Sequence, residues 1–129
     1  MLQGGMTMAR PVLVLVTLQY ACARLIRAGA DQALIAHVPL RVLHVANPDA
    51  ASIGEPVINA RALDHLYALS GEAGAEMCVL TSNVPVNAIA DYALSCSAQR
   101  IIMGSGENAA GIAQTLSALL PGVRVEILD

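Results

Sequence analysis

Strand-like and helix-like segments alternate five times along this sequence, and this alternation constrains the fold more than any other feature. Short apolar runs rich in Val, Ile and Leu predict strands at residues 12–17, 40–46, 76–81, 100–103 and 123–128. Longer stretches with apolar residues at helical spacing lie between them. Strands that alternate with helices form right-handed crossovers, which give a parallel sheet with helices on both faces.

The last expected strand differs from the others. Val123, Val125 and Ile127 alternate with Arg124, Glu126 and Leu128, whereas the first strand is apolar throughout. A continuous apolar run is typical of a strand buried on both faces, and alternation is typical of a strand with one partly polar face. The last strand is therefore expected at an edge of the sheet.

Length and composition indicate one α/β domain over residues 11–129, preceded by a short disordered lead-in at residues 1–10. The chain has 129 residues, of which 56% are hydrophobic and only 13% are charged, so a sizeable core is expected. Its seven basic residues are all Arg and are scattered, and the net charge is −3. Without a basic stripe or aromatic platforms, nucleic acid is not an expected partner.

The sequence predicts a cytoplasmic protein that has no membrane segment and no metal site. Residues 1–10 lack the apolar region of a signal peptide, and no apolar run has the length that a bilayer requires. The three cysteines share no C-x-x-C spacing and are expected to be free thiols. The three histidines likewise share no metal-ligand spacing, and no Ser/His/Asp or Cys/His order suggests catalysis.

A candidate anion site lies where the fourth strand gives way to a helix, at residues 104–108. Gly104 and Gly106 allow a tight turn and a close approach of a ligand, because neither carries a Cβ. The following helix would point unpaired N–H groups at this turn. In a doubly wound sheet, ligands bind at the carboxyl ends of strands where the strand order reverses, which here would include residues 17–19.

Several segments occur in an order and at a spacing that resemble the universal stress protein family. The similarity extends from Pro11 to Asp129 and is greatest to the stress-protein module of potassium-transport sensor kinases. It rests on VLVLVT (12–17), RLIRA (24–28), RVLHV (41–45), NAIADYA (87–93) and RIIMG (100–104). The resemblance implies a Rossmann-like, adenine nucleotide alpha hydrolase-like sheet in the order 3-2-1-4-5. It also implies homodimers that pair through strand five, and ATP bound between strands one and four.

The chain departs from the ATP-binding members of that family at three positions. Those members have Asp after the first strand, where this chain has Thr17. Their later glycine-rich pattern meets Gly104, but Glu107 and Ser117 stand where two further glycines belong. The nucleotide site is therefore expected to be degraded. Its candidate residues, implied by the resemblance and the expected strand ends, are Thr17, Leu18, Gln19, Val45, Gly104, Ser105, Gly106 and Asn108.

Two functions remain open from the sequence. The first is a non-catalytic regulatory module of the stress response that binds ATP weakly or not at all. The second is an ATP- or AMP-binding protein, or a slow ATP hydrolase, with an altered phosphate loop. In either case the expected partners are a second copy, through Val123, Val125 and Ile127, and a signalling protein. A dinucleotide site is disfavoured because the G-x-G-x-x-A match follows the fourth strand instead of the first.

Overall fold

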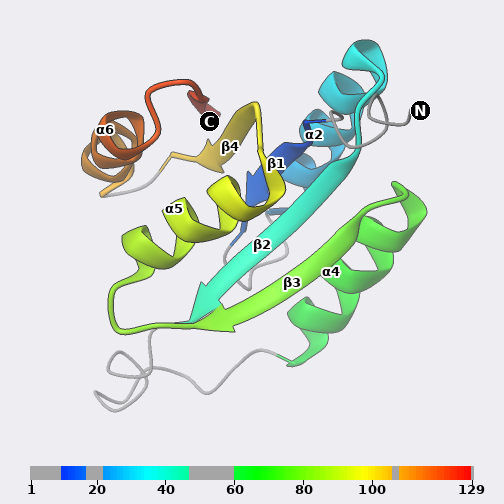
Figure 1. Ribbon diagram of the computed structural model, residues 1–129. Helices are drawn as coiled ribbons and strands as arrows, with labels where there is room; N and C mark the ends of the chain where they lie inside the picture. Colours follow the sequence, from blue (N-terminus) through cyan, green and yellow to red (C-terminus); the bar gives the residue numbers. More distant parts are fainter. Residues whose placement is uncertain (1–9, 17–21, 47–59, 106–107, 129) are drawn as a thin grey trace.

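A computed structural model describes residues 10–16, 22–46, 60–105 and 108–128 of the chain. Within these residues, five parallel strands form one sheet in the order β3-β2-β1-β4-β5 (Figure 1). This confirms the order 3-2-1-4-5 and the edge position of the last strand. The strands are β1 (Val12–Leu15), β2 (Leu40–Ala46), β3 (Glu76–Thr81), β4 (Arg100–Gly104) and β5 (Arg124–Leu128).

Helices cover both faces of the sheet. α2 and α4 pack on one face, and α5 and α6 pack on the other (Figure 1). Because successive side chains of a strand point to opposite faces, each central strand contributes to both layers. The helices are α2 (Ala23–Ala36), α4 (Ala60–Glu72), α5 (Pro85–Cys96) and α6 (Ala109–Leu119).

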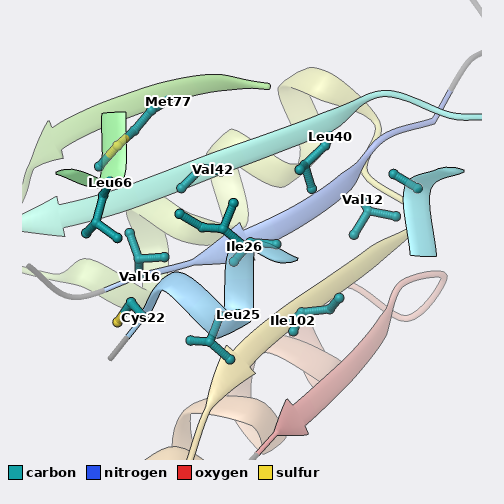
Figure 2. Close-up of a cluster of buried hydrophobic side chains, with 12 residues drawn as sticks. Val12, Val16, Cys22, Leu25, Ile26, Leu40, Val42, Leu66, Met77 and Ile102 are labelled. Atoms are coloured by element: carbon teal, nitrogen blue, oxygen red, sulfur yellow. The ribbon is translucent and has the colours of Figure 1, made fainter. Parts of the chain in front are cut away.

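The core between the sheet and the α2/α4 layer is built from aliphatic side chains (Figure 2). Val14 and Val42 from the sheet and Leu66 from α4 are completely buried there. Ile26 of α2 and Ile102 of β4 extend the same cluster toward the α2 side. Met77 is also buried, which confirms that it serves as core filler.

The core on the α5/α6 side uses the alternate residues of the same strands. Leu13, Leu43 and Ile101 face this layer and pack with Ala93 of α5 and Leu116 of α6. With no Phe or Trp in the sequence, small alanines on α5 let this helix lie close to the sheet. The two cores fix the sheet between the helices, and the strand ends are positioned by both layers.

Gly29 allows α2 to approach the sheet closely. A Cβ at this position would lie 2.3 Å from Val14 Cγ2 and 3.1 Å from Leu40 Cδ1. Neither distance leaves room for a methyl group without movement of the neighbour. The glycine thus serves packing here, because its φ is not among the positive values found in the described residues.

Some details of the helices differ from the sequence predictions. Helical spacing of apolar residues predicts that Ala36 of α2 and Leu94 of α5 face inward, but both are exposed. Ser82 and Asn83 are residue types that favour an N-cap, but neither caps α5. Val84 holds that position, and Ser82 Oγ accepts a hydrogen bond from its N–H at 3.0 Å. The Asn-, Pro- and Gly-containing segment 47–55, whose composition predicts a loop and a candidate mobile flap, lies outside the described residues.

None of the helices within the described ranges is both long enough and apolar enough to cross a membrane.

Candidate functional site

A cavity of about 380 Å³ opens at the carboxyl ends of the central strands. It is lined from β1, β2, β4 and the first turns of α2, α5 and α6. Of the residues predicted for the nucleotide site, Val45, Gly104, Ser105 and Asn108 line it. The other four, Thr17, Leu18, Gln19 and Gly106, lie outside the described residues, as does Glu107.

One wall of the cavity is apolar. Leu15, Leu43 and Val45 contribute from adjacent strands, and Ile89 and Ile112 contribute from α5 and α6. Such a wall suits a flat or hydrophobic group of a ligand, because the transfer of an apolar ligand group from water to an apolar surface costs little free energy. The volume also lies within the range of roughly 300–1,000 Å³ that is usual for small-molecule sites.

Two polar residues of the lining lie where β4 leads into α6. Ser105 is exposed, and its N–H donates to the carbonyl oxygen of Leu128 at 2.8 Å. That N–H is therefore not free for an anion. Asn108 begins α6, and its side chain makes no capping hydrogen bond, so the amide is available at the cavity.

Gly104 also lies against the first turn of α2, at the end of β4. Among the described glycines only Gly74 has a positive φ, so Gly104 does not need glycine for a left-handed turn. A Cβ on Gly104 would lie 3.2 Å from Leu25 Cδ1. The missing side chain thus lets the first turn of α2 lie against the end of β4. This brings α2 into the site.

Arg24 and His44 line the cavity and were not predicted. Arg24 lies in the first turn of α2, beside Leu25, and its side chain is exposed. His44 is half-buried on β2, and its Nδ1 lies 2.9 Å from the carbonyl oxygen of Val16. Since a carbonyl only accepts, Nδ1 must carry the proton, which fixes the ring and leaves Nε2 as the second polar atom.

A sequence signal exists for Arg24 but not for His44. The helix after the first strand begins at the same sheet edge as the helix after the fourth, so its first turn belongs to the site. Arg24 is a cation in that turn. His44 precedes Val45, but a strand position alone does not reveal that its imidazole crosses to the neighbouring strand.

The described lining has one charged side chain, the cation Arg24. It also includes His44 but neither Asp nor Glu among the residues that the structure describes. Within the same residues there is no group of three or more His, Cys, Asp or Glu that could hold a metal. The described chemistry of the cavity is that of a binding site for an anionic or polar ligand with an apolar part.

The residues predicted for the dimer contact lie in and just before β5, which is the edge of the sheet opposite to β3. Val123 and Val125 are half-buried and pack against the α5/α6 core, and Ile127 is exposed. β5 pairs only with β4 within the described sheet, so its outer edge is unpaired there.

The chain is similar in structure to several solved proteins. Residues covering 93% of the chain superpose on 98% of a universal stress protein from Archaeoglobus fulgidus solved in complex with dAMP, at 22% identity and a TM-score of 0.67. A protein of the universal stress protein family from Burkholderia pseudomallei matches over 94% of this chain and 96% of its own, at 17% identity and a TM-score of 0.67.

A third solved structure, a universal stress protein in complex with cAMP, covers 93% of this chain and 96% of its own at 18% identity and a TM-score of 0.60. No protein-family model and no curated protein matches the sequence. At these identities the comparison concerns the fold, and the shared strand order and near-complete coverage make it specific. The chain has the fold of the universal stress proteins.

Proposed function

We propose that this chain is a non-catalytic regulatory module of the universal stress protein type, which binds an adenine mononucleotide in the cavity between β1 and β4. The observation that carries the proposal is the cavity itself, at the point where the strand order reverses. Two structurally similar proteins were solved with dAMP and with cAMP, and both ligands are adenine mononucleotides.

A single phosphate suits the described residues better than a triphosphate. The N–H of Ser105 is already bonded to Leu128, so this backbone donor at the start of the β4–α6 connection is not available to a phosphate. Ser117, at one of the expected glycine positions, is an exposed residue inside α6 and not part of a loop. The apolar wall formed by Val45 and its neighbours suits the base.

The alternative from the sequence, a slow ATP hydrolase, needs a group that activates water. Among the described lining residues, His44 is the nearest to a general base, because its Nδ1–H donates to Val16 and leaves the lone pair of Nε2 to accept a proton. The described lining has neither Asp nor Glu to orient that imidazole or to hold a metal ion, and this favours binding without turnover. Release of phosphate from ATP, measured at high protein concentration with His44→Gln as the comparison, separates the two: turnover that this substitution abolishes would favour the hydrolase.

The remaining proposals concern the setting of the module. We propose a homodimer joined through β5, a signalling protein as the downstream partner, and a cytoplasmic location. The unpaired outer edge of β5 supports the first of these. The acidic composition and dispersed Arg residues support a protein or small-molecule partner over nucleic acid.

The test of nucleotide binding starts with mass spectrometry of the purified protein for co-purified nucleotide, followed by calorimetric titration with AMP and ATP. Val45→Phe fills the cavity and should abolish AMP binding. Val79→Phe is the matched control, because Val79 is an exposed position on β3 that does not line the cavity. Absence of AMP binding to the wild-type chain, or equal binding by Val45→Phe, would refute the proposal.

A further inference from the structure

Arg24, in the first turn of α2, lines the cavity, and the similarity to the universal stress proteins assigns it no role. We propose that Arg24 is the specificity-determining residue of the site, which binds the anionic group of the ligand against the first turn of α2. This rests on the proposed function, and it adds the position and chemistry of the anion contact.

The guanidinium of Arg24 is at the cavity and is available to bind a ligand. Arg24 lines the cavity, yet its guanidinium has neither an ion pair nor a hydrogen bond to any residue that the structure describes. By contrast, Arg100 is held by Glu126 and Gln32, and Arg41 donates to Tyr92. An exposed guanidinium with free donors can form paired hydrogen bonds with two phosphate oxygens.

The donors on the α6 side of the cavity are weaker contacts for an anion than Arg24. Among the described residues of this turn, the N–H of Ser105 is occupied by Leu128, and the Ser105 hydroxyl and the Asn108 amide are neutral donors. Arg24 is the only permanently charged group among the described lining residues. Charge-assisted hydrogen bonds are roughly twice as strong as neutral ones, so the cation decides where an anion binds.

The two sides of the site lie close together. Leu25 Cδ1 would lie 3.2 Å from a Cβ on Gly104, so the first turn of α2 and the end of β4 are in near contact. A ligand whose apolar part lies on Val45 and Ile112 can therefore present an anionic group to Arg24 while a neutral hydroxyl or amine faces Asn108. The ligand class is a nucleoside monophosphate or a molecule of like shape with one strong anionic group.

The sequence provides a matched control three residues away. Arg27 lies on the same helix and is equally exposed, but it does not line the cavity. Arg24→Gln and Arg27→Gln therefore change the net charge identically. Any difference between them reports the contact at Arg24 and not the general field of the protein.

The experiment measures AMP and adenosine affinities of the wild-type chain, Arg24→Gln and Arg27→Gln by calorimetry. Arg24→Gln should weaken AMP binding by about tenfold, the size usual for a charge-assisted hydrogen bond, and leave adenosine binding unchanged. Arg27→Gln should change neither affinity by more than about twofold, because it only alters a screened charge. Arg24→Lys should recover part of the AMP affinity.

The outcomes separate the two proposals. If the wild-type chain binds neither AMP nor adenosine, the proposed function fails and the Arg24 contact fails with it. If AMP binds and Arg24→Gln has no more effect than Arg27→Gln, nucleotide binding stands but Arg24 is not the anion contact. Equal losses for AMP and adenosine in Arg24→Gln would also overturn the assignment, since they would indicate a structural defect.

Discussion

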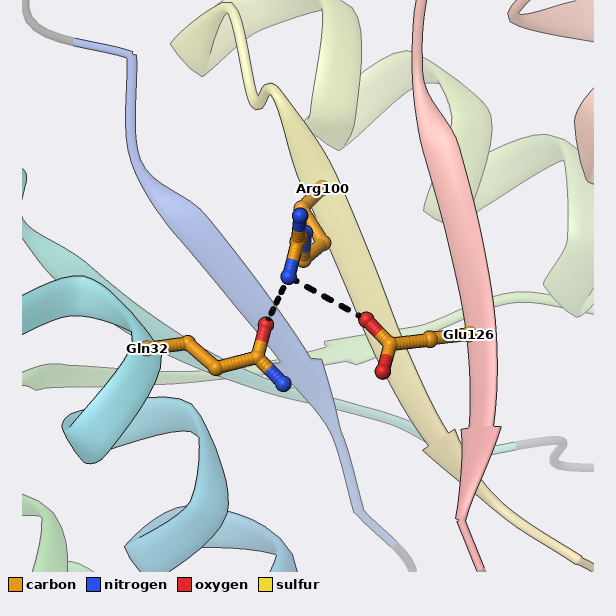
Figure 3. A network of polar contacts seen from close by, with 3 residues as sticks. All are labelled: Gln32, Arg100 and Glu126. Carbon is orange, nitrogen blue, oxygen red and sulfur yellow. Dashed lines mark hydrogen bonds and ion pairs between the residues drawn. The ribbon is translucent and has the colours of Figure 1, made fainter. Parts of the chain in front are cut away.

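The guanidinium of Arg100 on β4 lies 3.3 Å from the carboxylate of Glu126 on β5, and it also donates to the side-chain oxygen of Gln32 on α2 (Figure 3). One side chain thus joins an inner strand, the edge strand and a helix. The side chains of Arg100 and Glu126 are 29% and 34% exposed, respectively. The contact therefore contributes modestly to stability, but it fixes the edge strand against α2.

Removal of Arg100 should destabilise the chain more than removal of a solvated arginine. Arg100→Gln leaves Glu126 without its cation and Gln32 without its donor, and we expect a loss of about 1 kcal/mol in the free energy of unfolding. Urea unfolding measures it. The control is Arg61→Gln on the exposed face of α4, where we expect a change below about 0.5 kcal/mol. Equal effects of the two substitutions would show that the three-residue contact is energetically silent.

Gly29 and Gly111 should respond oppositely to substitution by Ala. Both lie within helices, where Ala is favoured by about 1 kcal/mol over Gly. Gly111 has open space around it, so Gly111→Ala should stabilise the chain by about 0.5–1 kcal/mol. At Gly29 the new methyl would lie 2.3 Å from Val14 Cγ2, and we expect a net loss of about 1–3 kcal/mol from overpacking.

A second substitution tests whether the clash is the cause. Val14→Ala removes the methyl group that Gly29→Ala would meet, so the cost of Gly29→Ala should shrink in the Val14→Ala background. Thermal or urea unfolding of the two single variants and the double variant gives this coupling. Strict additivity would show that the contact with Val14 is not the cause of the loss.

Much of this fold can be predicted from the sequence, because the strands are short apolar runs separated by helices with clear punctuation. β2 and β3 begin and end where the pattern places them, and the edge position of β5 follows from its alternation. The last turn of a helix is less predictable, as Leu94 shows, since it is exposed although its neighbour Ala93 in the same turn is buried.

The site was predicted less completely than the fold. The end of β4 was found from its glycines, and Gly104 and Asn108 do line the cavity. Arg24 was missed because its contribution depends on how closely α2 approaches β4, a distance set by packing at Gly104 and Leu25. His44 was missed because its role arises from an imidazole that reaches the neighbouring strand at Val16.

The thiol of Cys96 gives a prediction about pH. Burial raises the pKa of Cys96 above its ordinary value, and the nearby Arg41 partly opposes this by stabilising the thiolate. Arg41→Gln removes that cation, so the pKa should rise further and alkylation of Cys96 by iodoacetamide should move to higher pH. Mass spectrometry resolves each cysteine, and Cys78 serves as the control in the same sample. A pH profile of Cys96 that stays in place or moves down would contradict the role of Arg41.

The same shift has a consequence for stability. A thiol whose pKa is raised by folding favours the folded state at low pH, and this contribution is lost as the pH rises past the ordinary value of 9.0 toward the folded one. Cys96→Ala should therefore make the free energy of unfolding less steeply dependent on pH in the alkaline range. An unchanged slope would show that another group governs it.

The hydrogen bonds of β5 indicate which of its residues are free to bind a second copy. The N–H of Arg124 donates to Gln99 at 3.3 Å, and the carbonyl of Leu128 accepts from Ser105 at 2.8 Å, so the even-numbered residues face β4. Alternate residues of a strand direct their backbone groups to opposite sides, which leaves Val125 and Ile127 facing outward. An antiparallel pair centred on Val125 satisfies these groups in both copies.

The register of such a dimer follows from charge. Pairing centred on Val125 sets Arg124 of one chain opposite Glu126 of the other, whereas pairing centred on Glu126 sets two carboxylates face to face. Glu126 already contacts Arg100 of its own chain, so in the first register it would lie between two arginines. The first register is therefore the one that we expect.

Proline substitution separates the outer edge from the inner one. Val125→Pro removes an outward N–H and leaves the bonds to β4 intact, so it should give a folded monomer. Glu126→Pro removes an N–H on the β4 side and should instead destabilise the chain itself. Sedimentation at micromolar concentration, with circular dichroism of both variants, measures the difference. The proposal fails if the wild-type chain sediments as a monomer, or if Val125→Pro dimerises as well as the parent, because the outward backbone groups would then not be the contact.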